Sequence, residues 1–298
     1  MNLAEAEDRV RAVEGEINYL AAGSVINRRF VAPGVEHNTG TFEPHRVRVR
    51  DGRQIQDGFS LDAHGFVLAR RPSAVADFFD NAEVEAIYPG EVIETVKALT
   101  GADRVAAMGW LARTSGDLST RQQLAAGGMH RGGVQPPAAD VHVDLTPDRA
   151  ERWARVVYER TFPDGPGYSR FIASSLWRAF SEPPQDWPVA VCDGSSVGAD
   201  EGTPNTMFVV DELPSQAAML GEMPNEDSAL AAAVFRYNPE HRWWYFSNMT
   251  RDEVILLKFH DSDGGKARRA PHTAFRDPSF PDARVRESIE FRTMAYFD

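Results

Sequence analysis

The second half of this chain is a succession of short β-type segments separated by turn-forming residues, and this pattern restricts its fold more than any other feature. Runs rich in β-branched and aromatic residues lie at 187–193, 231–237, 242–246, 254–259 and 286–297. Many short strands with turn signals between them are typical of a β-sandwich or a barrel. We therefore expect a mainly β protein with flanking helices, in the α+β class.

The first half adds strands and supplies the helices. Strand signals occur at 28–33, 45–50, 65–72 and 104–114. Helices are expected at 73–81 with Ser73 as N-cap, at 90–100 before Gly101, and from Pro147 onward with Thr146 as N-cap. The turn Asn238-Pro239-Glu240 predicts a hairpin that joins 231–237 to 242–246. The Gly/Pro-rich run 127–140 and the acidic stretch 194–226 predict loops that cover a site.

Composition narrows the class of partner. The 298 residues are 42% hydrophobic, enough for a sizeable core, and the formal net charge is −12. Such an acidic chain is a poor partner for nucleic acid or an anionic membrane. The single cysteine, Cys192, excludes an internal disulfide and a cysteine-based zinc cluster. Without a hydrophobic signal core or a run of 18 apolar residues, we expect a cytoplasmic protein of undetermined oligomeric state.

The hexapeptide Val-His-Val-Asp-Leu-Thr, residues 141–146, contains a possible metal site. Residues two apart in a strand point to the same side, so His142 and Asp144 leave the backbone together. An imidazole and a carboxylate are two of the three ligands of a 2-His-1-carboxylate site for non-heme Fe(II). Composition alone predicts about one His-x-Asp or His-x-Glu in such a chain. A simple hydrogen-bonded pair therefore stays an alternative.

A third ligand and an anion site are expected downstream. His272 follows the strand 254–259 and its turn, and His260 is its rival as third ligand. Alternation in 286–297 places Arg286, Ser288, Glu290 and Arg292 on one face and Ile289, Phe291, Thr293, Ala295 and Phe297 on the other. Arg286 and Ser288 together suit a carboxylate. The alternative is an edge strand with a solvated polar face.

These residues carry a family resemblance. His142-x-Asp144, the distal His272 and Arg286-x-Ser288 resemble the signature of the Fe(II)/2-oxoglutarate-dependent oxygenases. The segments SLWRAF, VAVCD, HRWWYFSNMTRDEVILLKFHDS, PHTAFRDPS and RESIEFR are similar to the group of gibberellin desaturase-like enzymes, AsaB-type hydroxylases and the cephamycin methoxylation protein. The match covers roughly 140–298. Ser175 departs from the asparagine usual in that family, so a substrate contact cannot be carried over at this position.

The resemblance implies a fold and a mechanism. It implies a double-stranded β-helix, or jelly roll, with Fe(II) bound by His142, Asp144 and His272. It also implies 2-oxoglutarate as cosubstrate, with its far carboxylate on Arg286 and Ser288, and O2 as oxidant. The products would be succinate, CO2 and a small natural-product molecule oxidised at a C–H bond, through hydroxylation, desaturation or ring formation.

Several further residues have two interpretations. Arg170 and Arg178 could bind the cosubstrate or an acidic substrate, or belong to a solvated face. Trp243 and Trp244 are expected in the core, with one of them as a wall of the pocket. Cys192 is expected to be a small buried hydrophobe and not a nucleophile, because no basic neighbour is evident to lower the pKa of its thiol.

We expect one oxygenase domain over 1–298. In it, 1–103 packs on a jelly-roll core of 104–298 that contains an insert at 145–230. Two other functions stay open. A metal-dependent hydrolase or isomerase on the same barrel would not need Arg286. A non-catalytic small-molecule-binding partner protein would lack the metal residues.

Overall fold

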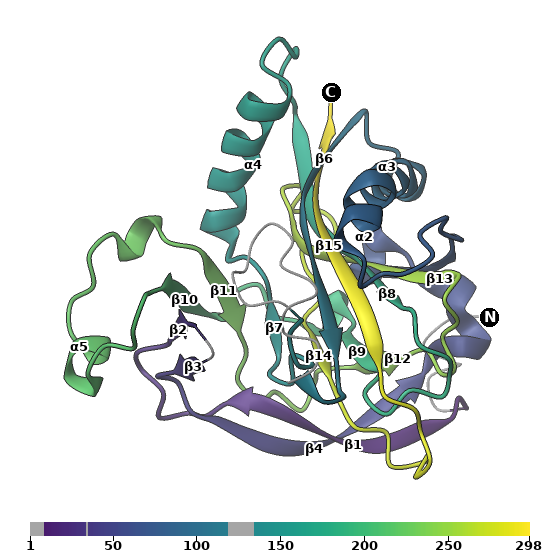
Figure 1. Cartoon of the computed structure of the whole chain (residues 1–298), viewed down its shortest axis with the longest axis horizontal. Coiled ribbons are helices and arrows are strands. Elements are labelled where there is room, and N and C mark those ends of the chain that lie inside the picture. Colours follow the sequence, from purple (N-terminus) through teal and green to yellow (C-terminus); the bar gives the residue numbers. More distant parts are fainter. Residues whose placement is uncertain (1–8, 34, 119–133) are drawn as a thin grey trace.

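Two β-sheets face each other in the computed structural model, which describes residues 9–33, 35–118 and 134–298 (Figure 1). The larger sheet has ten strands in the order β1 (Ala12–Leu20), β4 (Phe42–Asp51), β12 (Trp243–Tyr245), β9 (Val189–Cys192), β14 (His272–Ala274), β7 (His142–Val143), β11 (Ala231–Val234), β10 (Thr203–Val209), β2 (Arg28–Ala32) and β3 (Val35–Asn38). The smaller sheet has the order β5 (Phe66–Arg70), β13 (Glu253–Asp261), β8 (Arg170–Ala179), β15 (Glu287–Phe297) and β6 (Arg104–Thr114). The expected mainly β class and jelly-roll core are confirmed.

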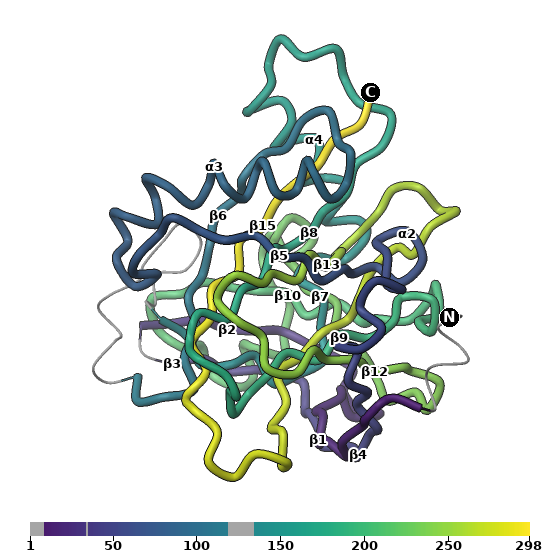
Figure 2. The backbone as a smooth tube through the Cα atoms, turned by 90° about the vertical axis from the view of Figure 1, so that its right-hand side faces the viewer, coloured from purple at the N-terminus to yellow at the C-terminus, as the bar shows by residue number. Residues whose placement is uncertain are grey.

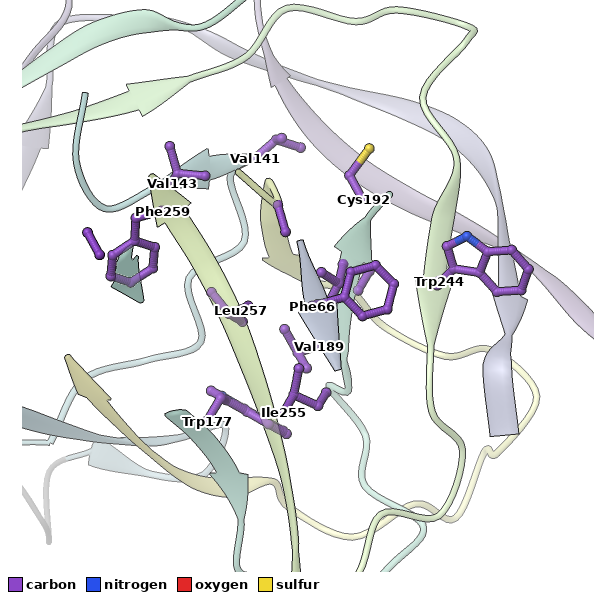
Figure 3. Close-up of a cluster of buried hydrophobic side chains, with 14 of the residues drawn as sticks. Phe66, Val141, Val143, Trp177, Val189, Cys192, Trp244, Ile255, Leu257 and Phe259 are labelled. Carbon is purple, nitrogen blue, oxygen red and sulfur yellow. The ribbon is translucent and has the colours of Figure 1, made fainter. Parts of the chain in front are cut away.

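An apolar cluster fills the space between the sheets. Trp177, Ile255 and Leu257 reach it from the smaller sheet, and Val143 and Val189 from the larger one (Figure 3). All five side chains are buried. Removing this much apolar surface from water is the main free-energy gain that holds the two sheets together.

A second apolar cluster covers the outer face of the smaller sheet. Helix α3 (Asn81–Thr100) packs on β6 and β15 and buries Val84, Tyr88, Val92 and Val96, spaced four residues apart on one face. The helix ends at Gly101, whose φ of 72° closes the last turn. Figures 1 and 2 both place α3 on the side of the smaller sheet that faces away from β1 and β4.

The predicted helix at 73–81 is wrong. Helix α3 begins only at Asn81, and its N-cap is Asp80, whose carboxylate accepts from the amides of Ala82 and Glu83. Upstream of Asp80, glutamate side chains pair with a segment that has no regular secondary structure. Glu83 accepts from the amides of Ala76 and Asp77. Glu91 accepts from the amide of Ala74 and from the side-chain hydroxyl of Ser73. With those amides already paired, this stretch gains little from helical bonds.

Helix α4 (Pro147–Thr161) lies where the sequence predicts it, with Thr146 at the N-cap position. Its buried residues Ala150, Ala154, Val157 and Tyr158 form one stripe that belongs to the cluster between the sheets. The other helices within the described residues are short: η1 (Gly52–Gly58), α2 (Leu61–His64), η3 (Gly194–Ser196), α5 (Gln216–Leu220) and η4 (Glu226–Ser228).

The predicted hairpin at Asn238 is also wrong. A turn forms there, but β11 pairs with β10 and β7 while β12 pairs with β4 and β9. Three strands, β9, β14 and β7, lie between them in the sheet. In a jelly roll, strands that follow one another in the sequence can lie far apart in the sheet. Turn-forming residues alone do not reveal this separation.

The stretch 194–226 is more ordered than a loop, because it contains β10 and α5. Strand β10 pairs in parallel with β2 and so forms part of the larger sheet. Of the predicted loop 127–140, residues 127–133 lie outside the described residues, and 134–140 lead without a regular element into β7. Strand β8, at the centre of the smaller sheet, lies within the segment expected as an insert.

One irregularity in β6 affects the site. Arg292 pairs with Gly109 and Thr293 with Ala107, so Met108 is an extra residue, a β-bulge. Gly109 adopts a φ of 134°, which side-chain-bearing residues rarely adopt. Before the bulge the even-numbered Ala106 faces the cluster between the sheets, whereas after it the even-numbered Trp110 faces α3.

The first hundred residues enter both sheets, with β1 to β4 in the larger one and β5 in the smaller one. Among the residues that the structure describes, no helix is both long and apolar enough to cross a membrane.

Candidate metal and cosubstrate site

Two histidines meet across neighbouring strands of the larger sheet. His142 on β7 stands directly opposite His272 on the antiparallel β14, with ring centroids 4.5 Å apart. Asp144 follows one residue after β7, and its Oδ1 lies 3.5 Å from Nε2 of His142. One ligand atom from each of the three residues lies within 4.8 Å of the others. The structure thus brings together the three residues that the sequence proposes as metal ligands.

Backbone carbonyls orient both imidazoles. Nδ1 of His142 lies 2.7 Å from the carbonyl oxygen of Asp140, and Nδ1 of His272 lies 3.2 Å from that of Ala270. A proton on each Nδ1 leaves each Nε2 with a free lone pair, the usual arrangement of a metal-binding histidine. Burial and the neighbouring His142 lower the pKa of His272 to about 4, so its ring is neutral at pH 7, as metal binding requires.

Asp144 is ionised and partly engaged. Burial would raise the pKa of Asp144, but the Arg292 guanidinium together with both histidines holds it well below the usual range. Nε of Arg292 donates to Oδ2 of Asp144. Oδ1 faces His142 and, among the residues that the structure describes, makes no comparable bond to an arginine or lysine side chain. Two imidazoles and one carboxylate are a donor set that fits Fe(II).

Arg286 and Ser288 provide buried donors that lack partners. Arg286 is 2% exposed, and of its guanidinium nitrogens only Nη1 donates to a described residue, to the carbonyl of Trp187 at 3.1 Å. Nε and Nη2 of Arg286 and Oγ of Ser288 have no hydrogen-bond partner among the described residues. Burial, with the nearby Arg113, lowers the pKa of Arg286 to about 9, which still leaves it charged at pH 7. Buried donors are costly to leave unpaired, so this arrangement fits a carboxylate such as the far end of 2-oxoglutarate.

The two other arginines proposed for this site have different surroundings. Arg178 is 1% exposed and donates to the hydroxyl of Tyr88 and to the carbonyls of Arg251 and Arg71, on the α3 side of the smaller sheet. Arg170 forms a two-bond ion pair with Asp261, at 2.8 and 2.6 Å. Like Arg286 and Ser288, these two arginines do not line the large cavity described below. Protein groups engage both guanidinium groups, whereas Nε and Nη2 of Arg286 have no hydrogen-bond partner among the described residues. We therefore leave them out of the proposed cosubstrate site.

Other sequence expectations can be placed as well. Trp243 and Trp244 are buried in the core, and neither lines that cavity, so the expected tryptophan wall is not at these positions. Burial raises the pKa of Cys192 to about 12, which agrees with a small buried hydrophobe. His260 lies 3.4 Å from Glu151 and takes no part in the triad.

A cavity of about 540 Å³ opens beside the triad. His142 and Asp144 line it together with Arg113 and Arg292, and Phe259, whose ring stacks on that of His272, forms another part of the wall. Most of the remaining wall is apolar, and it includes Met108, Leu145, Trp153, Met207, Leu230 and Val234.

Sequence reasoning missed Arg113, Trp153 and the role of Arg292. Arg113 lies on the same face of the sheet as Ser288, its partner across β6 and β15, and only the bulge at Met108 brings it there. Trp153 projects from α4. The sequence predicts this helix but does not indicate that the helix lies beside the cavity. Arg292 lies on the polar face of β15 that the sequence predicts. Its place on that face with Arg286 and Ser288 was the signal that could have assigned it to the site.

Comparison with known proteins decides the family. Residues 17–296 match the model of a family described as an oxidoreductase/YMDC permease-like domain. The Fe(II)/2-oxoglutarate-dependent dioxygenase NvfI of Aspergillus novofumigatus is 31% identical over 274 residues, which cover 89% of this chain and 87% of that protein. The chain belongs to the Fe(II)/2-oxoglutarate-dependent oxygenases. The hydroxylase/desaturase EfuI of Hormonema carpetanum is 33% identical to this oxygenase, with 85% of this chain and 83% of that protein covered.

A solved structure agrees with this family. The iron and α-ketoglutarate-dependent endoperoxidase NvfI superposes with a TM-score of 0.76 at 27% identity, with 97% of this chain and 99% of that chain covered. The oxygenase is therefore an enzyme whose cofactor is Fe(II) and whose cosubstrates are 2-oxoglutarate and O2. The expected family, reaction class and cofactors are confirmed.

Proposed function

We propose that this oxygenase binds Fe(II) through His142, Asp144 and His272 and 2-oxoglutarate through Arg286 and Ser288. It would oxidise a C–H bond of a small natural-product-type substrate held in the cavity beside them. The observation that carries this proposal is the convergence of the three ligand atoms within 4.8 Å of one another, beside a cavity that His142 and Asp144 line. Bound iron supplies, with 2-oxoglutarate and O2, the oxidising power for breaking a C–H bond, and succinate and CO2 are released.

The protein residues have separate tasks in this reaction. The carbonyls of Asp140 and Ala270 keep the two imidazoles in the tautomer that exposes Nε2. Arg286 supplies a charged, water-excluded donor pair that recognises one end of the cosubstrate and so fixes its direction. Removing water from such a site strengthens each of these electrostatic contacts and limits side reactions.

The cavity supports a substrate that is largely apolar and of small-molecule size. Its wall is dominated by aliphatic and aromatic side chains. One group of polar residues lies at the metal ligands, and a second group, Arg29, Glu36, Asn38 and Asn205, lines the cavity from β2, β3 and β10. Relatives named hydroxylase/desaturase and endoperoxidase support an oxidation of this kind. Hydroxylation, desaturation and ring formation are the outcomes proposed for this chain.

The arrangement favours an oxygenase over the metal-dependent hydrolase. A hydrolase needs only a metal-bound water and would leave the buried donors of Arg286 and Ser288 without a purpose. A non-catalytic binding protein would not need the complete donor set. We further propose that 1–298 acts as one oxygenase domain, and the single cysteine supports a reducing compartment.

The test is an anaerobic titration of the iron-loaded protein with 2-oxoglutarate. Chelation of iron by this cosubstrate gives a weak visible charge-transfer band, which requires no knowledge of the final substrate. We expect the band in the wild type, its loss in His142→Ala, and a need for much more 2-oxoglutarate in Arg286→Ala. No band in a folded, iron-loaded wild type would overturn the cosubstrate assignment.

A further inference from the structure

Four charged side chains, two buried arginines and two partly buried carboxylates, form a continuous charge network that ends at a proposed metal ligand. Nε and Nη2 of Arg113 donate to the two carboxylate oxygens of Glu290 at 3.0 and 3.2 Å. Nη2 of Arg292 donates to Oε1 of Glu290 at 3.0 Å, and Nε of Arg292 donates to Oδ2 of Asp144. The charge network extends from β6 through β15 of the smaller sheet to the end of β7 in the larger sheet.

This charge network leaves only one oxygen of Asp144 available to a metal. Oδ2 is taken by Arg292, while Oδ1 is the oxygen 3.5 Å from Nε2 of His142. A carboxylate with two unengaged oxygens can bind a metal through one or both of them. The facial triad needs single-oxygen binding, because the remaining metal positions are required for cosubstrate and O2.

We propose that Arg292 is a positioning residue that holds Asp144 as a single-oxygen ligand of the iron, and that Glu290 and Arg113 hold Arg292 in place. The proposal rests on the assignment of Asp144 as a metal ligand made above. It adds a role for three residues outside the ligand set and outside the cosubstrate site.

The charges in the network explain why Arg292 alone would not suffice to hold Asp144. Arg292 is 8% exposed, and a buried charge needs compensation beyond one shared carboxylate. Glu290 supplies that compensation and is itself fixed by the two-bond contact from Arg113. Nη1 of Arg113 donates to the carbonyl of Pro136 at 2.9 Å, and this bond connects the charge network to the cavity wall. Two guanidinium groups and two carboxylates balance one another before any metal binds.

Another ion pair of the protein, outside the charge network, offers a matched control for Arg292. Arg170 forms a similarly buried ion pair with Asp261, through two hydrogen bonds, at the junction of β8 and β13. Asp261 is not a member of the triad, and neither residue lines the cavity. Arg170→Met therefore removes an arginine–aspartate pair without touching the proposed ligand set.

The experiment measures Co(II) binding by the metal-free protein, with a competing chelator for affinity and the visible d–d absorption for coordination. We expect Arg292→Met to weaken Co(II) binding about 10- to 100-fold, the usual effect of losing a residue that supports a ligand, and to change the shape of the absorption band. Arg292→Lys, which keeps the charge, should give an intermediate loss. Arg170→Met should retain the wild-type band and an affinity within about twofold of wild type, because it leaves every partner of the ligands in place.

A second variant protects the test against misfolding. Arg292→Met leaves two buried carboxylates facing one guanidinium, whereas the double variant Arg292→Met/Glu290→Gln restores the balance of charge. Circular dichroism and thermal melting of the apoproteins identify the folded variants. The folded double variant should show the same loss of Co(II) affinity and the same altered band as Arg292→Met. Wild-type affinity and a wild-type band in either folded variant would overturn the positioning role.

His142→Ala separates this inference from the metal assignment beneath it. If His142→Ala abolishes Co(II) binding while Arg292→Met has no effect, the ligand set stands and only the role of Arg292 is wrong. If His142→Ala binds Co(II) like the wild type, the ligand set itself is wrong, and the inference about Arg292 fails with it.

Discussion

His142 and His272 form a direct cross-strand pair on β7 and β14, although the chain between them contains α4 and six strands. Such a pair has its side chains on the same face of the sheet, so the two rings must converge whatever the intervening chain does. Single changes at these positions therefore test the site most directly.

Replacing His272 should remove metal binding without unfolding the protein. His272→Ala deletes one of three ligands, and we expect Co(II) or Mn(II) affinity to fall at least about 100-fold, because outer-shell losses alone cost 10- to 100-fold. Calorimetric titration of the apoprotein measures this. His260→Ala is the control, because His260 was the rival ligand and pairs instead with Glu151. A metal affinity lost in His260→Ala and kept in His272→Ala would reverse the assignment.

Replacing Arg286 should weaken 2-oxoglutarate binding and leave metal binding intact. A charge-assisted hydrogen bond contributes about 1.5–3 kcal/mol, so Arg286→Ala should raise the Kd for 2-oxoglutarate about 10- to 100-fold. Titration of the anaerobic Fe(II) protein at the charge-transfer band gives that Kd. Arg178→Met serves as the control for a buried arginine of the same sheet that lies on the α3 side. An equal rise in Kd in both variants would indicate a general structural effect.

Gly109 should be intolerant of a side chain. Its φ of 134° at the bulge is accessible to glycine, and an alanine there costs about 1–3 kcal/mol of backbone strain. Gly90→Ala is the opposite case, since Gly90 lies within α3 and a Cβ there meets no atom within 4 Å. We expect Gly90→Ala to stabilise by about 0.5–1 kcal/mol. Urea unfolding of both apoproteins measures these free energies, and equal signs for the two changes would contradict the argument.

His241 should make the apoprotein less stable in mild acid. Burial lowers the pKa of His241 below 6.5, an effect that Glu201 only partly offsets. The unfolded chain then binds the proton more readily, so the free energy of unfolding falls as pH drops from about 7 through the folded-state pKa. His241→Gln cannot titrate and should lose less stability over that interval. Urea unfolding at pH 7 and 5.5, with a chelator present, compares the two, and parallel pH profiles would refute the assignment.

The sequence was most informative where alternation or a cap determines the structure locally. The polar face of β15 and the start of α4 at Pro147 follow from side-chain patterns alone, and the structure confirms both. The fold as a jelly roll needed the resemblance to a family, because turn signals do not encode which strands pair.

The errors came from competition that only the folded chain reveals. The hairpin at Asn238 failed because β9, β14 and β7 lie between its two arms. The helix at Ser73 failed because Glu83 and Glu91, up to 17 residues away, accept hydrogen bonds from backbone amides of the preceding segment. Arg113 was missed because a simple two-residue alternation assigns it to the wrong side of β6.

The bulge at Met108 also determines which changes in chain length this gene could tolerate. Deleting one residue there would restore continuous alternation and exchange the two faces of one end of β6. Trp110 would then turn toward the cavity, and the guanidinium of Arg113 would turn into the apolar cluster beneath α3. An in-frame loss of a single codon would thus place a charge in the core and remove a support of Asp144 at once, although every residue that contacts the metal would still be encoded.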